Sequence, residues 1–155
     1  MNSQLTWAYF LQSGGRLALF TRGAVDDSDD EHILRLYDIR RKNGGDPVST
    51  INLEKFPVIK RKYPDGEVES VSGEINCAVF SPDGIYLAVA RNDNIVDVYD
   101  SRFLERGFLH RFRHEDPNFN TPGFFGFGIV ETQWKESFDG RSLGLITGGN
   151  DGIHY

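Results

Sequence analysis

The chain is poor in sulfur: among its 155 residues there is one cysteine, Cys77, and one methionine. A single cysteine cannot form a disulfide within the chain, which excludes the small secreted folds that depend on disulfides. Cys77 lies in an apolar run typical of a strand, so we expect it to be a small buried side chain. The expected location is therefore a reducing compartment, the cytoplasm or the nucleus.

Long apolar runs and amphipathic helical patterns are also missing. No uninterrupted apolar stretch is long enough to cross a bilayer, and the N-terminus lacks the basic start and apolar core of a signal peptide. We expect no membrane partner. Aromatic residues make up 13% of the chain, mostly as 12 Phe and 6 Tyr, and there are 17 Gly. This composition favours an all-β protein of short strands joined by tight turns.

Recognisable catalytic and metal-binding motifs are absent. The four histidines, at positions 32, 110, 114 and 154, show no His-Glu-x-x-His or paired Cys-His spacing, and there is no Gly-x-Ser-x-Gly turn. We therefore expect a protein that is not an enzyme and that needs no metal or cofactor. The net charge of -6 opposes a general role in coating nucleic acid, although Lys60-Arg61-Lys62 is locally basic.

What the chain does contain is a short unit that recurs. In the middle copy an apolar run at 75–80 leads through the turn Ser81-Pro82-Asp83-Gly84 into a second run at 86–90. A second turn at 92–94 and a third run at 95–100 follow, and 109–112 can supply a fourth strand. The run 86–90 is apolar at successive positions, which is typical of a strand covered on both faces. Each small sheet is therefore expected to stack against neighbours.

The other two copies follow the same order. The first copy lies 70 positions earlier, with a longer acidic loop around 26–31, a third strand that ends in Tyr37-Asp38-Ile39-Arg40, and a fourth strand at 47–53. The third copy begins at 129–134 and reaches Tyr155, the counterpart of Asp97 in the middle copy. Recurrence of this kind is typical of repeat architectures.

These residues resemble the WD-repeat β-propeller family, whose blades contain a Phe-Ser-Pro-Asp-Gly turn and end in Trp-Asp. Here Tyr99-Asp100 and Tyr37-Asp38 stand in place of Trp-Asp. The resemblance implies blades of four antiparallel strands at 5–53 and 75–113, a truncated blade at 129–155, and long connections at 54–74 and 114–128. Because propellers close with about four to eight blades, the implied ring is incomplete.

The incomplete ring has two explanations. Either further blades follow Tyr155 in a longer protein, which the ending inside a strand favours, or the ring is completed by association. We expect the chain alone to expose apolar blade faces and to self-associate.

The resemblance also implies which residues shape each blade. Within a family blade, a His, a Ser or Thr, an Asp and the Trp can form one hydrogen-bond network. His114 is a candidate for the His, Thr147 matches the hydroxyl position, and Val89 occupies that position in the middle copy. We expect Asp93 to bond the backbone of its own turn. The full set of matching positions is Phe80, Asp83, Gly84, Asp93, Tyr99, Asp100, Tyr37, Asp38, Thr147 and Asp151.

The function implied by the resemblance is a non-catalytic scaffold that binds other proteins. Tyr37 to Arg40 and Tyr99 to Arg102 match the aromatic-Asp-x-Arg box of propellers that recruit substrates to cullin-type ubiquitin ligases, which makes Arg40 and Arg102 candidate contact residues. Alternatively, each arginine pairs with a carboxylate of a neighbouring blade. The competing class is a propeller enzyme, a hydrolase or a quinoprotein-like oxidoreductase, whose active site lies mainly in other blades.

Two loop segments give further hypotheses. Phe124, Phe125 and Phe127 either cover a blade face or offer an apolar anchor to a partner. The acidic loop from Asp26 to Glu31 has Glu at the sixth position, where a calcium loop requires Gly, so we expect a solvated loop. Ser28, which acidic residues follow, is a hypothetical site for an acidophilic kinase.

Overall fold

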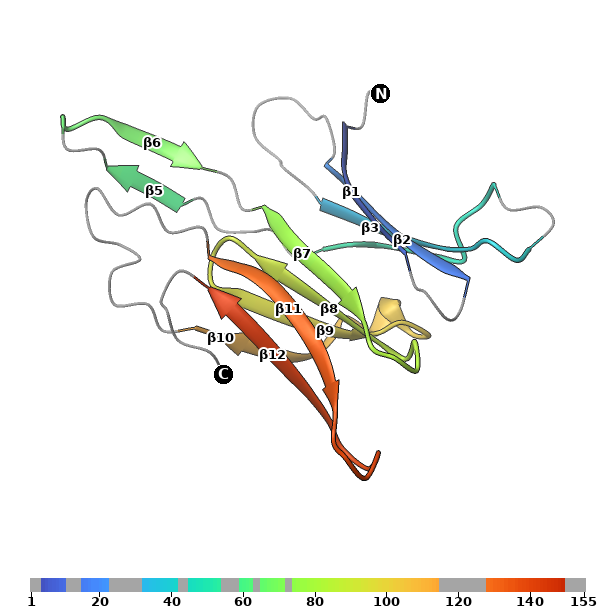
Figure 1. Cartoon of the computed structure of the whole chain (residues 1–155). Coiled ribbons are helices and arrows are strands. Elements are labelled where there is room, and N and C mark those ends of the chain that lie inside the picture. The colour runs from blue at the N-terminus through green and yellow to red at the C-terminus, as the bar shows by residue number, and fades with distance from the viewer. Residues whose placement is uncertain are drawn as a thin grey trace.

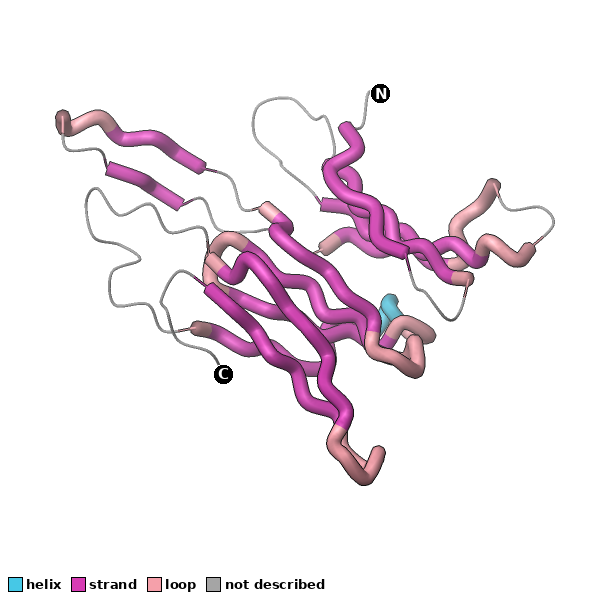
Figure 2. Tube along the Cα trace, viewed as in Figure 1, coloured by secondary structure: helices cyan, strands magenta, loops and turns pink. Residues whose placement is uncertain are grey.

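A computed structural model describes residues 4–10, 15–22, 32–41, 45–53, 59–62, 65–71, 74–114 and 128–149. These residues form antiparallel strands and one short 3-10 turn, which confirms the all-β prediction (Figure 1). Short turns at 81–85, 92–94 and 137–142 each join two consecutive strands (Figure 2). No helix in this described part of the chain could span a membrane.

Two four-stranded sheets follow the chain in simple up-and-down order. The N-terminal sheet contains β1 (Gln4–Phe10), β2 (Arg16–Arg22), β3 (His32–Asp38) and β4 (Ser49–Asn52). The central sheet contains β7 (Ile75–Phe80), β8 (Tyr86–Arg91), β9 (Ile95–Asp100) and β10 (Phe108–Arg113), with the 3-10 turn η1 (Leu104–Arg106) between β9 and β10.

Two further pairs of strands complete the described structure. The C-terminal sheet is the hairpin of β11 (Ile129–Glu136) and β12 (Leu143–Gly149). A side hairpin of β5 (Ile59–Lys62) and β6 (Val68–Val71) lies in the connection between the N-terminal and central sheets, apart from the other strands (Figure 1). The sequence predicted a long connection at 54–74 and not these two strands.

The central sheet is covered on both faces, as the apolar run of β8 predicted. On one face Leu87, Val89 and Tyr99 pack with the N-terminal sheet, which contributes Phe20 and Leu36. On the other face Ala88, Ala90, Val96 and Val98 pack against Ile129, with Trp134 and Leu145 of the C-terminal sheet beside them. Successive strand residues point to opposite faces, so an uninterrupted apolar strand serves two cores at once.

The first hairpins of the N-terminal, central and C-terminal sheets share an irregularity in register, and β10 and β9 have a similar one between Phe108 and His110. A β-bulge follows Leu5 in β1, Ile75 in β7 and Ile129 in β11, within the first two paired residues of each strand. These positions lie 70 and 54 residues apart, the same offsets that relate the sequence copies. A bulge bends a strand and increases its twist, so the three hairpins share one local shape.

The turn between β7 and β8 and the turn between β11 and β12 have the same pattern of side-chain hydrogen bonds. Ser81 Oγ donates to Asp83 Oδ1 at 2.5 Å and accepts the backbone N–H of Tyr86 at 2.8 Å. Ser137 Oγ donates to Asp139 Oδ1 at 2.6 Å and accepts the N–H of Ser142 at 2.9 Å. Gly84 and Gly140 adopt φ of 72° and 65°, which favours glycine at both positions.

Candidate functional site

The two Tyr-Asp-x-Arg boxes lie close together, at one end of their sheets. Arg16, which pairs with Asp38 across β2 and β3, donates from Nη1 to Ser101 Oγ at 2.8 Å. Ser101 Oγ donates in turn to the carbonyl oxygen of Gly84 at 2.7 Å. The backbone N–H of Ile39 in the first box donates to the carbonyl oxygen of Gly15, next to Arg16, at 2.8 Å. Hydrogen bonds through Gly15 and Arg16 therefore connect the two boxes and the Ser-Pro-Asp-Gly turn.

Within each box the arginine and the aspartate form a bidentate ion pair, in which two N–H groups of the guanidinium bind the two carboxylate oxygens. Arg102 donates from Nε and Nη2 to the Asp100 carboxylate at 2.9 and 2.7 Å, and its backbone N–H donates at 2.9 Å. Arg40 binds Asp38 in the same way, at 2.9 and 3.0 Å from the side chain and 3.1 Å from the backbone. Among the described residues, each arginine pairs with the aspartate of its own box, and the alternative, a pair with a carboxylate of a neighbouring blade, stays untested.

The ion pairs hold the arginines while leaving them open to solvent. The side chains of Arg40 and Arg102 are 65% and 49% exposed, whereas Asp38 and Asp100 are 19% and 14% exposed. Gly15 leaves room for the aliphatic part of Arg40, because a Cβ at Gly15 would lie 2.8 Å from the Arg40 Cγ. Each guanidinium group is thus held in place by its aspartate while part of it remains exposed to solvent.

The aspartates remain ionised over the whole physiological range of pH. The side-chain hydrogen bond from Arg40 lowers the pKa of Asp38 to about 2. The bond from Arg102 lowers the pKa of Asp100 in the same direction. A guanidinium has five N–H groups, and the carboxylate uses two of them, so each arginine keeps three donors for the oxygen atoms of a partner.

A buried ionic cluster lies across β8, β9 and β10 of the central sheet. Arg91 Nε and Nη2 donate to the Asp93 carboxylate at 3.0 and 2.5 Å, and Arg91 Nη1 donates to Asp97 Oδ2 at 3.1 Å. Arg111 donates to both Asp97 oxygens, at 2.6 Å from Nε and 2.9 Å from Nη2. Asp93 therefore binds a side chain two residues earlier, and the expectation that it bonds its own turn backbone is wrong.

Sequence reasoning missed Arg91, Asp97 and Arg111. The available signal was Asp97 itself, an acidic residue in the apolar run of β9, because a buried carboxylate needs a positive partner. The turn predicted at 92–94 is present, and within it Asn94 adopts φ of 64°. That conformation is one that asparagine tolerates.

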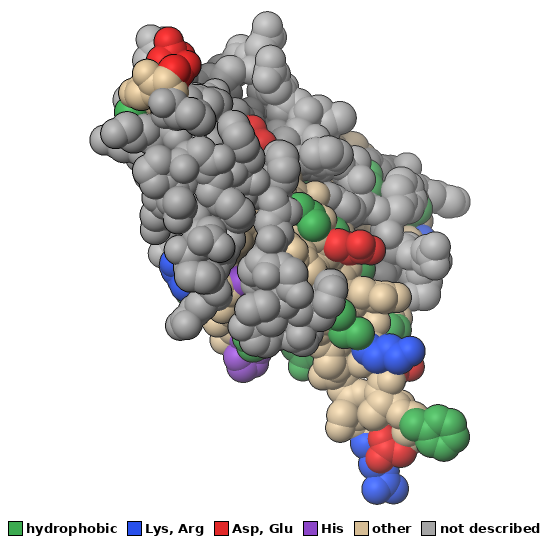
Figure 3. Space-filling view, turned by 60° about the vertical axis from the view of Figure 1, so that its left-hand side comes forward, with side chains coloured by type: hydrophobic (Ala, Val, Ile, Leu, Met, Phe, Trp, Pro, Cys, Tyr) green, Lys and Arg blue, Asp and Glu red, His purple; other side chains and the backbone are tan. Residues whose placement is uncertain are grey.

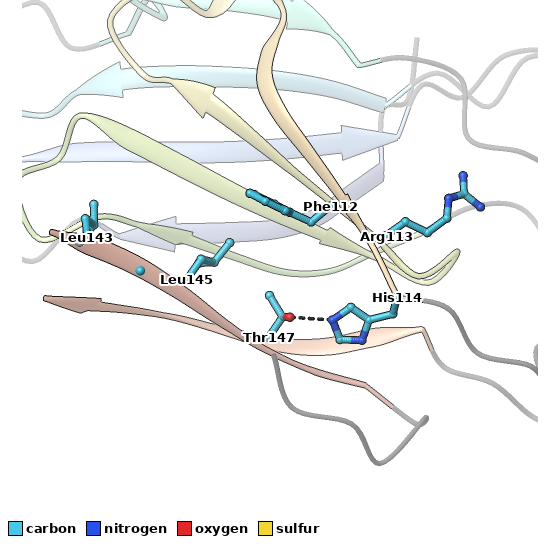
Figure 4. A pocket seen from close by; sticks show the side chains of 7 residues that line it. Phe112, Arg113, His114, Leu143, Leu145 and Thr147 are labelled. Carbon is cyan, nitrogen blue, oxygen red and sulfur yellow. Dashed lines mark hydrogen bonds between the residues drawn. The ribbon is translucent and has the colours of Figure 1, made fainter. Parts of the chain in front are cut away.

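The structure brings His114 and Thr147 together, as the resemblance implied. His114 Nε2 lies 2.7 Å from Thr147 Oγ1, and both side chains are buried. They meet at a cleft of about 540 Å³ between β10 and β12, which Phe112, Leu143 and Leu145 also line (Figure 4). Val89, at the counterpart of Thr147, instead packs in the core that the central and N-terminal sheets share.

The remaining motif residues have structural roles. Phe80 and Tyr99 are buried between the central and N-terminal sheets, and Tyr37 is half-buried on β3. Cys77 is half-buried, with Sγ 3.5 Å from Thr132 Oγ1. Several predicted positions lie outside the described residues: Phe124, Phe125, Phe127, Asp151, and the acidic loop from Asp26 to Glu31 with Ser28.

The turn between β11 and β12 carries an exposed aromatic residue. Phe138 takes the place that Pro82 has in the central sheet, and its side chain is fully exposed. In Figure 3 the molecule narrows to a tip that bears hydrophobic, acidic and basic side chains. Among the residues whose structure is described, no group of three or more His, Cys, Asp or Glu side chains could hold a metal ion.

Comparison of the chain with models of protein families finds no match, and none of the curated proteins matches it.

Proposed function

We propose that the chain is built of WD-repeat propeller blades and serves as a non-enzymatic scaffold for protein–protein interaction. The observation that carries this proposal is the repeated bulge, which recurs in three hairpins at the offsets of the sequence copies. The repeated Ser-Asp turn bonds support it independently. A unit that keeps both its register and its turn chemistry is typical of a repeat architecture.

The stacking of the sheets also supports a repeat architecture. The central sheet has two apolar faces, and it buries them against one sheet before it and one after it in the chain. Neighbour-to-neighbour burial is how repeat proteins obtain a continuous core. The finer assignment, to propeller blades, rests on the resemblance of the motif residues.

The surface of the two Tyr-Asp-x-Arg boxes is the binding site that we propose for a protein partner. Arg40 and Arg102 have little side-chain entropy left to lose, because their aspartates already hold them. Arginine is also enriched among the residues that dominate binding energies. In the sharper form of the proposal, the partner is an adaptor of a cullin-type ubiquitin ligase and the scaffold is a substrate receptor.

The test is direct binding of such a purified adaptor to the full chain. We expect the double variant Arg40→Ala, Arg102→Ala to weaken binding by roughly tenfold or more, as loss of central interface arginines commonly does. Arg141→Ala, in the exposed turn between β11 and β12, is the matched control and should bind normally. Equal affinity of the double variant and the wild-type chain would reject the receptor role.

A further inference from the structure

The turn η1 presents a positively charged aromatic cluster beside the second Tyr-Asp-x-Arg box. Phe103 is 39% exposed, and its ring lies under two guanidinium groups. The Cζ atom of Arg106 is 4.3 Å from the ring centroid and that of Arg102 is 5.6 Å from it. Each distance is within the range of a cation–π contact.

The backbone holds this cluster rigidly. Leu104 is buried in the core that the central sheet shares with the N-terminal sheet. The N–H of Phe103 donates to the carbonyl oxygen of Asp100 at 3.0 Å, and the N–H of Arg106 donates to that of Phe103 at 3.0 Å. The buried Leu104 side chain and the hydrogen bonds of the turn therefore fix the backbone positions from which the exposed side chains of Phe103 and Arg106 project.

The two arginines differ in their charge balance. The charge of Arg102 is compensated by the bidentate pair with Asp100. In the described part of the chain, no carboxylate lies within ion-pair distance of Arg106. Glu105, the next acidic residue, lines a separate cleft toward Ile51 and Asn52 of β4, which neither arginine lines. Arg106 lies near enough to Asp100 to contribute to the lowered pKa of that carboxyl, but it makes no ion pair in the described part of the chain, so its guanidinium keeps donors for a partner beside the exposed ring.

We propose that this cluster, Arg102, Phe103 and Arg106, recognises an acidic segment of a partner protein that places a carboxylate next to an apolar side chain. The carboxylate accepts N–H groups of Arg106, and the apolar side chain contacts the part of the Phe103 ring that stays exposed beside the guanidinium groups. Charge complementarity selects the partner: the chain as a whole is acidic, with net charge -6, and Arg106 presents a guanidinium that no ion pair in the described part of the chain occupies. The inference rests on the proposed scaffold function and extends its binding surface beyond Arg40.

The test uses fluorescence anisotropy with the full chain and three labelled peptides: one that alternates Asp and Leu, one that alternates Asn and Leu, and one that alternates Asp and Gly. We expect the Asp-Leu peptide to bind best and to weaken as salt is raised, because exposed charges are screened. Arg106→Gln should weaken its binding by roughly fivefold, the effect of losing a charged hydrogen bond at a surface. Phe103→Ala should reduce the preference for Asp-Leu over Asp-Gly.

The control is Arg113→Gln, because Arg113 is also exposed but lies at the end of β10 that is far from η1. It should leave the affinity unchanged. Equal binding of the Asp-Leu and Asn-Leu peptides, or an unchanged affinity in Arg106→Gln, would overturn the proposal. Because Arg40→Ala, Arg102→Ala reports on the adaptor and Arg106→Gln on the peptide, failure of one proposal is distinguishable from failure of the other.

Discussion

Removal of the Asp97 carboxylate should destabilise the chain more than any change at an exposed acidic residue. Asp97 is 2% exposed and binds two arginines, of which Arg91 is 3% exposed and Arg111 is 29% exposed. In Asp97→Ala, Arg111 can turn to water, but Arg91 cannot. Loss of one partner from a buried ion pair costs about 3 to 5 kcal/mol. Because Arg91 keeps its two bonds to Asp93, we expect the lower end, about 3 kcal/mol.

Urea denaturation followed by far-UV circular dichroism measures this loss. With a slope of about 2 kcal/mol per molar urea, the midpoint should fall by about 1.5 M. Glu105→Ala, which removes an exposed carboxylate, should move the midpoint very little. Arg111→Ala should cost less than Asp97→Ala, because it leaves Asp97 bound to Arg91. A loss of less than about 1 kcal/mol in Asp97→Ala would refute the reasoning that Arg91 depends on both carboxylates.

Two further predictions follow from a glycine contact and from an ion pair. Gly128 adopts φ of 69°, and a Cβ there would lie 2.4 Å from the backbone carbon of Asn92, so Gly128→Ala should lower the melting temperature by several degrees in calorimetry. Gly45→Ala, with nothing within 4 Å of the added carbon, should leave it unchanged. Asp38 should titrate near pH 2 by NMR and return toward 3.8 in Arg40→Ala. Because the folded pKa is the lower one, the pair stabilises the fold above about pH 4 and loses this effect as pH falls toward 2; a wild-type midpoint near 3.8 would contradict the observed hydrogen bonds.

The strands of the central sheet could be predicted because several local signals agreed. Pro82 and Gly84 fixed one turn, Asn94 fixed the next, and the uninterrupted apolar run of β8 predicted burial on two faces. The bulges could not be predicted in this way. A register shift does not require a particular residue type. The pairing skips Thr6 and Asn76, and these two residues share no property that distinguishes them from other strand residues.

The ionic contacts were harder to predict than the strands. A carboxylate in a turn bonds either its own backbone or a nearby cation, and the choice depends on where the chain brings that cation. Arg91 reaches Asp93 because its side chain is confined beside β9 and β10, where Asp97 also lies. For the same reason the sequence could nominate Arg40 and Arg102 as candidate contact residues but could not show that each is held by the aspartate two residues before it.

The two-sided burial of the central sheet has a consequence for the time course of synthesis. Its face toward the N-terminal sheet can be covered as soon as Leu104 has been made, since every other member of that core precedes it. Its other face, with Val96 and Val98, stays uncovered until Ile129, Trp134 and Leu145 appear. At translation rates of about 5 to 20 residues per second, the delay is about 2 to 10 seconds. During that interval the nascent chain exposes an apolar β surface on which chaperones and other nascent chains compete with the hairpin of β11 and β12.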